Sequence, residues 1–210
     1  MFVKIYITSS VFLLALVVIL SATGQTSADS VELSPFQQFL KHKSPNAQIE
    51  QADLTSDSTP ENYSLVNGIL TITQHAQELW ASSPDWWIDS FDIADATHNG
   101  KINLVLSLWK SGNYGPSNPF WIQENDPSVK NHLFVMEYNN DAFAQVWGSS
   151  NLSVPNCEFS FSDIDNDGKQ ELVVIEGEYT EDFSCTGKYR AIWKWNEWGF
   201  YNESRSDLHS

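Results

Sequence analysis

Short alternating hydrophobic segments dominate the chain from Tyr63 onward. They are rich in β-branched and aromatic residues, and clusters of Gly, Asn, Asp or Pro separate them, which is typical of antiparallel strands. The pattern predicts strands at residues 69–73, 104–106, 133–138, 159–162, 172–175 and 191–195. No long segment beyond residue 43 keeps a helical period. The sequence therefore predicts an all-β domain.

Turn-forming residues connect several of these segments. Asn67-Gly68 directly precedes the strand at 69–73, and this dipeptide is the one best suited to a type I′ hairpin turn. Asn139-Asn140-Asp141 and Asn196-Glu197 lie between aromatic strands in the same way. We therefore expect β-hairpins at all three places.

One short helix is expected, at residues 35–43. Ser34 can cap it, Gln37 completes a capping box, and Pro35 suits its first turn. Residues 44–62 are polar and contain two prolines. We therefore assign 25–51 to a short helix and linker, and 52–205 to the β domain.

The N-terminal residues 1–24 have the order of a secretory signal peptide. Lys4 precedes ten consecutive apolar residues at 11–20, and small residues follow as far as Gly24. The apolar run is short for a membrane span. This predicts a secreted or extracellular protein, periplasmic in a Gram-negative host, with no membrane span after cleavage. The alternative is an uncleaved membrane anchor.

The composition narrows the choice of partners. With 11 basic and 27 acidic side chains, the formal charge is -16, which would repel nucleic acids and anionic membranes. The aromatic content, with nine Trp and twelve Phe, is too high for a disordered acidic chain.

Two cysteines cannot form a four-cysteine zinc site. In an oxidising compartment we expect Cys157 and Cys185 to form a disulfide; two buried free thiols are the alternative.

The strongest chemical signal is an acidic loop at residues 163–171. Carboxylates occupy its positions 1, 3, 5 and 9, and Gly168 at position 6 permits a sharp turn. So many crowded negative charges favour a hard divalent cation with oxygen ligands, which indicates Ca²⁺ rather than Mg²⁺. The expected ligands are the side chains of Asp163, Asp165, Asp167 and Glu171 and the carbonyl of Lys169. The loop is no EF-hand, because its flanks are predicted strands; a solvated acidic turn without metal is the alternative.

Two weaker copies of this loop precede it in the chain. The expected ligands are Asp95, Thr97, Asn99 and Asn103 in one copy, and Asp53, Thr55, Asp57 and Glu61 in the other. Counting charged ligands ranks the affinity for Ca²⁺ as highest at 163–171 and lowest at 95–103. The alternative at 95–103 is an empty turn held by Asn and Thr hydrogen bonds, and at 53–61 a polar linker.

Three Asp-rich loops, each leading into an apolar strand, resemble FG-GAP/VCBS repeats, the units of integrin-α-like β-propellers. The resemblance covers roughly residues 52–201 and implies propeller-like blades, calcium at the loops between strands, and an extracellular binding or structural role. Closed propellers need about four to eight blades, and about three copies fit here. The expected architecture is therefore either a set of propeller-like blades that closes through another subunit or an open stack of antiparallel sheets.

Exposed aromatic side chains are the candidates for ligand binding. Trp86 and Trp87 lie shortly before the loop at 95–103, and Tyr114 and Trp121 lie in a long segment rich in Gly and Pro. Flat aromatic faces suit sugar rings, although core packing is the commoner use of such residues.

The sequence contains no motif that indicates a catalytic residue. We therefore expect a secreted, calcium-binding, non-enzymatic module that presents a surface to an extracellular glycan or protein. A secreted carbohydrate-active enzyme or glycan-binding protein is the alternative.

Overall fold

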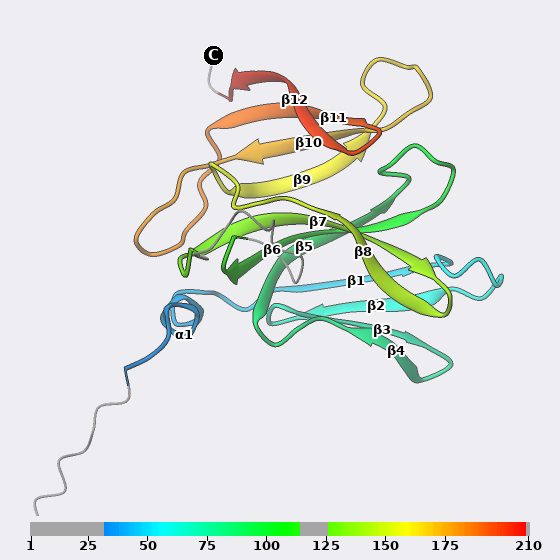
Figure 1. Ribbon diagram of the computed structural model, residues 1–210, viewed down its shortest axis with the longest axis horizontal. Helices are drawn as coiled ribbons and strands as arrows, with labels where there is room; N and C mark the ends of the chain where they lie inside the picture. The colour runs from blue at the N-terminus through cyan, green and yellow to red at the C-terminus, as the bar shows by residue number, and fades with distance from the viewer. Residues whose placement is uncertain (1–31, 114–125, 209–210) are drawn as a thin grey trace, which may run out of the picture. The chain divides into compact units, whose positions relative to one another are not determined.

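The computed structural model describes residues 32–113 and 126–208, and these residues form one short helix and three four-stranded antiparallel sheets (Figure 1). The first sheet contains β1 (Ala47–Ala52), β2 (Glu61–Val66), β3 (Ile69–Gln74) and β4 (Gln77–Ala81). The middle sheet contains β5 (Trp86–Ala94), β6 (Asn103–Ser111), β7 (Val129–Asn139) and β8 (Ala142–Gly148). The third sheet contains β9 (Asn156–Ser162), β10 (Glu171–Glu176), β11 (Tyr189–Asn196) and β12 (Gly199–Asp207). Strands that follow one another in the chain are neighbours within each sheet.

This architecture confirms the prediction of an all-β domain with stacked antiparallel sheets and about three repeats. The six predicted strands lie within β3, β6, β7, β9, β10 and β11. Strand β1 lies in the segment that the sequence analysis describes as polar, so the first sheet begins before Ala52. This strand, AQIEQA, is an edge strand and pairs only with β2.

Two-residue turns set the register of the hairpins. Asn67 and Gly68 have φ values of 51° and 77°, and Asn140 and Asp141 have values of 50° and 63°. Positive φ at both central residues is the requirement of a type I′ turn, which fits the predictions at both positions. The turn at Asn67-Gly68 pairs Val66 with Ile69 and thereby fixes the alignment of β2 with β3.

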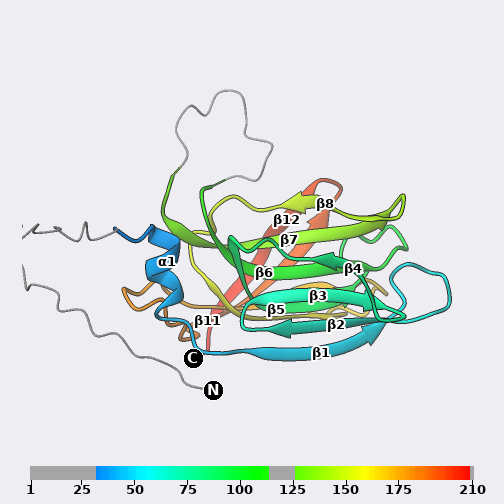
Figure 2. The ribbon, with the colours of Figure 1, turned by 90° about the horizontal axis from the view of Figure 1, so that it is seen from below.

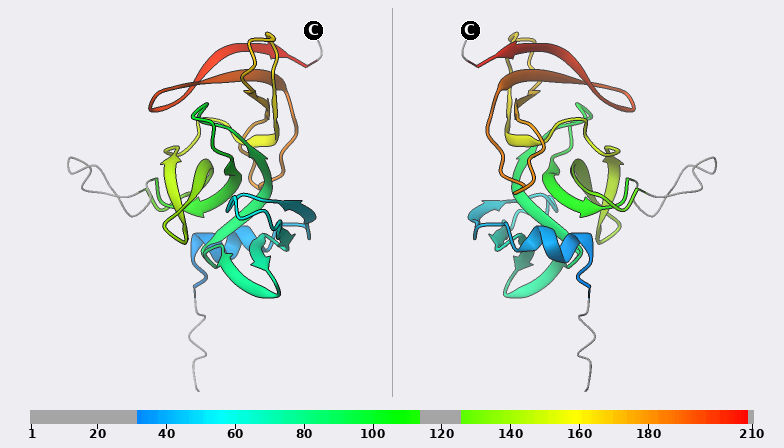
Figure 3. Two further views of the ribbon diagram at one scale, coloured as in Figure 1. Left: turned by 90° about the vertical axis from the view of Figure 1, so that its right-hand side faces the viewer. Right: turned by 90° about the vertical axis from the view of Figure 1, so that its left-hand side faces the viewer.

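The middle sheet is buried on both faces. Alternate residues of β6 point to opposite sides: Leu104 and Leu106 join a core with the first sheet, whereas Val105 joins a core with Leu172 and Val174 of the third sheet. Eight of the nine residues of β6 are buried. Figure 3 shows the middle sheet, in green, between the other two.

The helix α1 (Pro35–Leu40) is shorter than predicted. Its capping box between Ser34 and Gln37 is present, and its C-cap residue is Lys41. Phe39 is fully buried and packs on Trp109 of β6, with ring centroids 5.3 Å apart. The helix therefore contributes to a third, aromatic-rich core at one end of the sheets (Figure 2).

The predicted disulfide between Cys157 and Cys185 is present. It joins β9 to the segment between β10 and β11, which contributes Tyr179 and Phe183 to the aromatic core next to α1. In the part of the chain that the structure describes, no helix is long and apolar enough to cross a membrane.

Candidate functional site

The three acidic segments occupy the same place in the three sheets. Residues 53–61 (the first loop), 95–103 (the second loop) and 163–171 (the third loop) each connect the first strand of a sheet to its second strand. Figure 1 shows all three on the right, at one end of their sheets. The second and third loops are in contact, because the Nε2 atom of His98 lies 2.9 Å from the carbonyl oxygen of Gln170.

The backbone conformation repeats as well. The fourth and sixth positions of every loop have positive φ, whatever residue stands there. These positions are Ser56 and Ser58, His98 and Gly100, and Asn166 and Gly168. Non-glycine residues seldom adopt such angles without compensating interactions, so the three loops share a specific, closed shape.

The side chain at the first position holds this shape. Asp53 accepts hydrogen bonds from the backbone N–H groups of Asp57 and Ser58, at 3.1 and 2.9 Å. Asp95 accepts the same two bonds from positions 5 and 6 of its loop, at 3.1 and 2.9 Å. Asp163 accepts one from Gly168 at 3.0 Å. One aspartate thus closes each loop.

The ninth position provides a buried polar side chain beneath each loop. Glu61, Asn103 and Glu171 are at most 2% exposed. The N–H groups of Leu54 and Ile164 donate to the glutamates of the first and third loops, at 2.8 and 2.9 Å. These bonds hold a buried carboxylate against the second residue of each of these two loops.

Carboxylates converge in the first and third loops. Ligand oxygens of Asp53, Asp57 and Glu61 lie within 4.8 Å of one another, and so do those of Asp163, Asp165 and Glu171. These are groups that could hold a metal ion. In the third loop the donor set fits such an ion, because the Oδ1 atom of Asp163 is buried and has no hydrogen-bond partner, which is costly for a charged oxygen.

Not every predicted ligand joins these two groups. Asp167 lies outside the group in the third loop, and its Oδ1 atom accepts a hydrogen bond from the N–H of Lys169 at 2.8 Å. In the first loop, the hydroxyl of Thr55 donates to Glu61 at 2.6 Å, so this hydroxyl lies beside the carboxylate group.

The second loop is closed by hydrogen bonds instead. Besides the two bonds to Asp95, the N–H of Lys101 donates to Asn99 at 2.8 Å, and Thr97 contacts Asn103 at 3.4 Å. The predicted ligands of this loop are therefore assembled, but with a single carboxylate among them. This geometry matches a turn held by Asn and Thr side chains.

A side chain on the third strand of each sheet completes the arrangement. The residues opposite the ninth loop positions are Gln74, Glu137 and Lys194. This placement follows when each of the strand pairings Asn62↔Thr73, Leu104↔Met136 and Leu172↔Trp193 is extended by one residue. Gln74 donates to Asp57 at 3.0 Å and to Glu61 at 3.2 Å. The sequence analysis did not identify any of these three residues.

The three partners differ in charge. The Nζ atom of Lys194 lies 2.7 Å from Asp165 and 4.0 Å from Glu171, so an internal cation contacts two of the three carboxylates of the third loop. Glu137 brings a carboxylate to the second loop, and Lys101 pairs with it at 2.6 Å. Each loop therefore has its own local charge balance.

These contacts shift the ionisation of the groups involved. The hydrogen bond from Lys194 lowers the pKa of Asp165 and in turn raises the pKa of Lys194. The pKa of Asp57 is lowered, first by the N–H of Thr59 and then by Gln74. The hydrogen bond from Lys101 lowers the pKa of Glu137. All three carboxyl groups are thus held in the charged form that binds cations.

The aromatic candidates separate into different environments. Trp86 packs against the core of the first and middle sheets and makes an edge contact with Phe134, with centroids 5.3 Å apart. Trp87 borders a surface cleft that lies at the other end of the sheets from the loops. Tyr114 and Trp121 lie outside the described residues.

Comparison with known protein families, curated proteins and solved structures finds no match to this chain. The fold and the loops define a protein of three similar antiparallel sheets, each carrying one closed polar loop between its first two strands. Two of these loops contain convergent carboxylates.

Proposed function

We propose that the protein is an exported, calcium-binding β-repeat module in which the first and third loops each hold a Ca²⁺ ion. The observation that carries the proposal is the convergence of three carboxylates in each of these two loops. The bound ions stabilise the strand connections, and the module serves a binding or structural role rather than a catalytic one.

The ligand chemistry supports calcium among the biological cations. The converging side chains are all oxygen donors, which suit hard cations and not the softer transition metals. The exposed Asp57 and Asp165 leave room for water molecules and carbonyl groups, and Ca²⁺ accepts six to eight oxygens in variable geometry. Mg²⁺ requires a stricter octahedron and retains more of its water.

Two further parts of the proposal have separate support. The disulfide between Cys157 and Cys185 is compatible with an oxidising compartment, and this supports export. One acidic loop at the same position in each of three four-stranded sheets supports membership of the FG-GAP/VCBS repeat class.

Removal of metal tests the proposal directly. We expect Ca²⁺ to raise the melting temperature of the purified protein and EGTA to lower it again. At a free concentration about 100 times Kd, a single site stabilises the folded state by about 2.7 kcal/mol. Calorimetric titration should give two sites, and Asp163→Asn should remove one, because the amide keeps the acceptor for Gly168 but loses the charge.

A matched control is Asp141→Asn. Asp141 is exposed in the turn between β7 and β8, where Asn tolerates the positive φ equally well. This variant should titrate like the wild type. If Ca²⁺ changes neither the melting temperature nor the heat of titration of the wild-type protein, the proposed function is wrong.

A further inference from the structure

A surface cleft of about 660 Å³ lies at the end of the sheets remote from the acidic loops. Its walls come from three segments: the residues between α1 and β1, the start of β5, and the segment between β10 and β11 that the disulfide joins to β9. The loops follow the last residues of β1, β5 and β9, whereas the cleft borders Asn46, directly before β1, and residues near the start of β5 and β9. It is therefore a separate feature.

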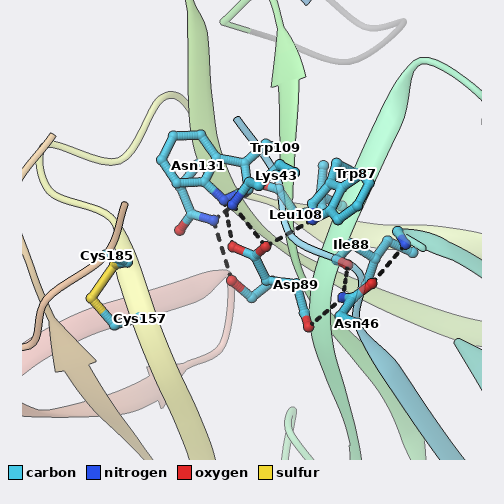
Figure 4. Close-up of polar contacts among 12 residues, drawn as sticks. Lys43, Asn46, Trp87, Ile88, Asp89, Leu108, Trp109, Asn131, Cys157 and Cys185 are labelled. Atoms are coloured by element: carbon cyan, nitrogen blue, oxygen red, sulfur yellow. Dashed lines mark hydrogen bonds and ion pairs between the residues drawn. A yellow bond between two sulfur atoms is a disulfide. The ribbon is translucent and has the colours of Figure 1, made fainter. Parts of the chain in front are cut away.

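The floor of the cleft is a compact polar cluster around Asp89 (Figure 4). One carboxylate oxygen accepts hydrogen bonds from Lys43 at 2.9 Å and from the indole N–H of Trp87 at 3.0 Å, and the other accepts one from the indole N–H of Trp109. The Lys43 ammonium also lies 4.6 Å from the centroid of the Trp109 ring. Lys43 and Asp89 thus neutralise each other.

Hydrogen bonds of the Asn46 side chain fix the backbone around Asp89. The side-chain amide of Asn46 donates to the carbonyl oxygens of Ile88 and Asp89, at 2.8 and 3.0 Å, and its oxygen accepts the N–H of Gly68 at 2.8 Å. On the opposite wall, the disulfide fixes Cys185 next to Phe183, whose ring packs on Phe39. The cleft is therefore preformed, as most ligand sites are.

The charges disfavour ionic ligands. An anion finds no unpaired cation on the floor, because Lys43 is already paired with Asp89. His42 also borders the cleft, but it is exposed, and an exposed charge pair contributes little. A cation finds one further carboxylate, Asp182, but this group is exposed and hydrogen-bonded to Ser184, and an exposed ion pair contributes little. A wholly apolar ligand would displace water from the exposed serine hydroxyls at the margin of the cleft without replacing the hydrogen bonds of that water.

What remains for a ligand is aromatic surface beside uncharged polar groups. Trp87 and Phe183 are half-buried and border the cleft, and the hydroxyls of Ser44 and Ser184 lie at its exposed edge. Aromatic faces carry negative charge density, to which the weakly positive C–H groups of a sugar ring are attracted. The volume lies within the range of small-molecule sites.

We propose that this cleft binds a neutral saccharide of about one or two rings. One ring face contacts the aromatic side chains, and the sugar hydroxyls bond to the serine and backbone groups of the walls. The inference is independent of calcium, since none of its residues belongs to the loops.

Filling the cleft tests the inference without removing any contact of the fold. Ser44 is exposed and borders the cleft, so Ser44→Trp places a bulky ring in the space. Ser160→Trp is the matched control, because Ser160 is exposed on β9 and does not border the cleft. The probes are cellobiose, maltose, lactose and diacetylchitobiose, with glucuronate and glucosamine as charged comparisons, and binding is followed by tryptophan fluorescence and by NMR.

We expect at least one neutral disaccharide to bind the wild type saturably. Its affinity should fall at least about tenfold in Ser44→Trp and stay unchanged in Ser160→Trp, with equal melting temperatures for the three proteins. The inference is overturned if no neutral probe binds, if only the charged sugars bind, or if Ser44→Trp binds as well as the wild type.

Discussion

A side chain on the third strand gives each of the two carboxylate-rich loops a different partner. Gln74 is uncharged and donates hydrogen bonds to the first loop, whereas Lys194 places a positive charge beside the carboxylates of the third. A bound Ca²⁺ would have to displace or tolerate this ammonium group. The higher count of carboxylates in the third loop therefore does not by itself establish the higher affinity.

Lys194→Gln tests this effect, because it gives the third loop the partner that the first loop already has. We expect its Ca²⁺ affinity to rise by about tenfold, equivalent to about 1.4 kcal/mol, since the like-charged neighbour is gone. In EGTA the variant should melt below the wild type, because the carboxylates lose their internal cation. Both effects are measured by calorimetric titration and thermal unfolding.

Lys188→Gln provides the matched control for this prediction. Lys188 forms an exposed ion pair with Glu178 at 2.6 Å, and neither residue belongs to a loop. Its removal should leave calcium binding unchanged. An unaltered calcium affinity in Lys194→Gln would show that the ammonium group does not influence the third loop.

At the level of strands, the sequence predicts segments with a clear apolar pattern and misses polar strands at the sheet edges. The strands around Leu104 and Leu133 were predictable because their apolar residues face a core. Strands β1 and β12 lie at sheet edges, and the exposed β12 has the polar sequence GFYNESRSD. Pairing with a neighbour defines such strands, and no hydrophobic pattern records that pairing.

The same reasoning applies to the candidate site. The spacing of the acidic residues predicts the loops because consecutive residues form them. The partner Gln74 could have been found as well, since the Asn67-Gly68 turn fixes the register of β2 with β3. Glu137 and Lys194 could not, because long connections precede β7 and β11 and leave the strand alignment open.

The disulfide also constrains the arrangement of the strands, and its removal should lower the free energy of unfolding. Cys157 and Cys185 are 28 residues apart, so replacing both by serine should destabilise the fold by about 2–5 kcal/mol. The loss should be visible in the near-ultraviolet signal of the aromatic core, because the bridged segment carries Tyr179 and Phe183. A reducing agent should lower the melting temperature of the wild type and leave the double variant unchanged. If the oxidised wild type and the double variant were equally stable, the disulfide would not contribute to the stability of the fold.

At the scale of the whole molecule, the middle sheet couples the other two. The first sheet and the third sheet each bury one face against it, and neither has a second core within the described residues that could replace that contact. The residues 33–208 therefore behave as one unit, in keeping with their internal contacts. Stability added at any loop should then reach all three sheets.

Two adjacent residues of β7 test this coupling. Leu133 belongs to the core with the third sheet, and Phe134 belongs to the core with the first; both are at most 1% exposed. We expect Leu133→Ala to cost about 2–5 kcal/mol and Phe134→Ala about 3–5 kcal/mol. Differential scanning calorimetry should show a single transition in both variants, because loss of either interface exposes a face of the middle sheet. Two separate transitions in either variant would mean that one outer sheet unfolds independently, and the calcium dependence would then have to be assigned sheet by sheet.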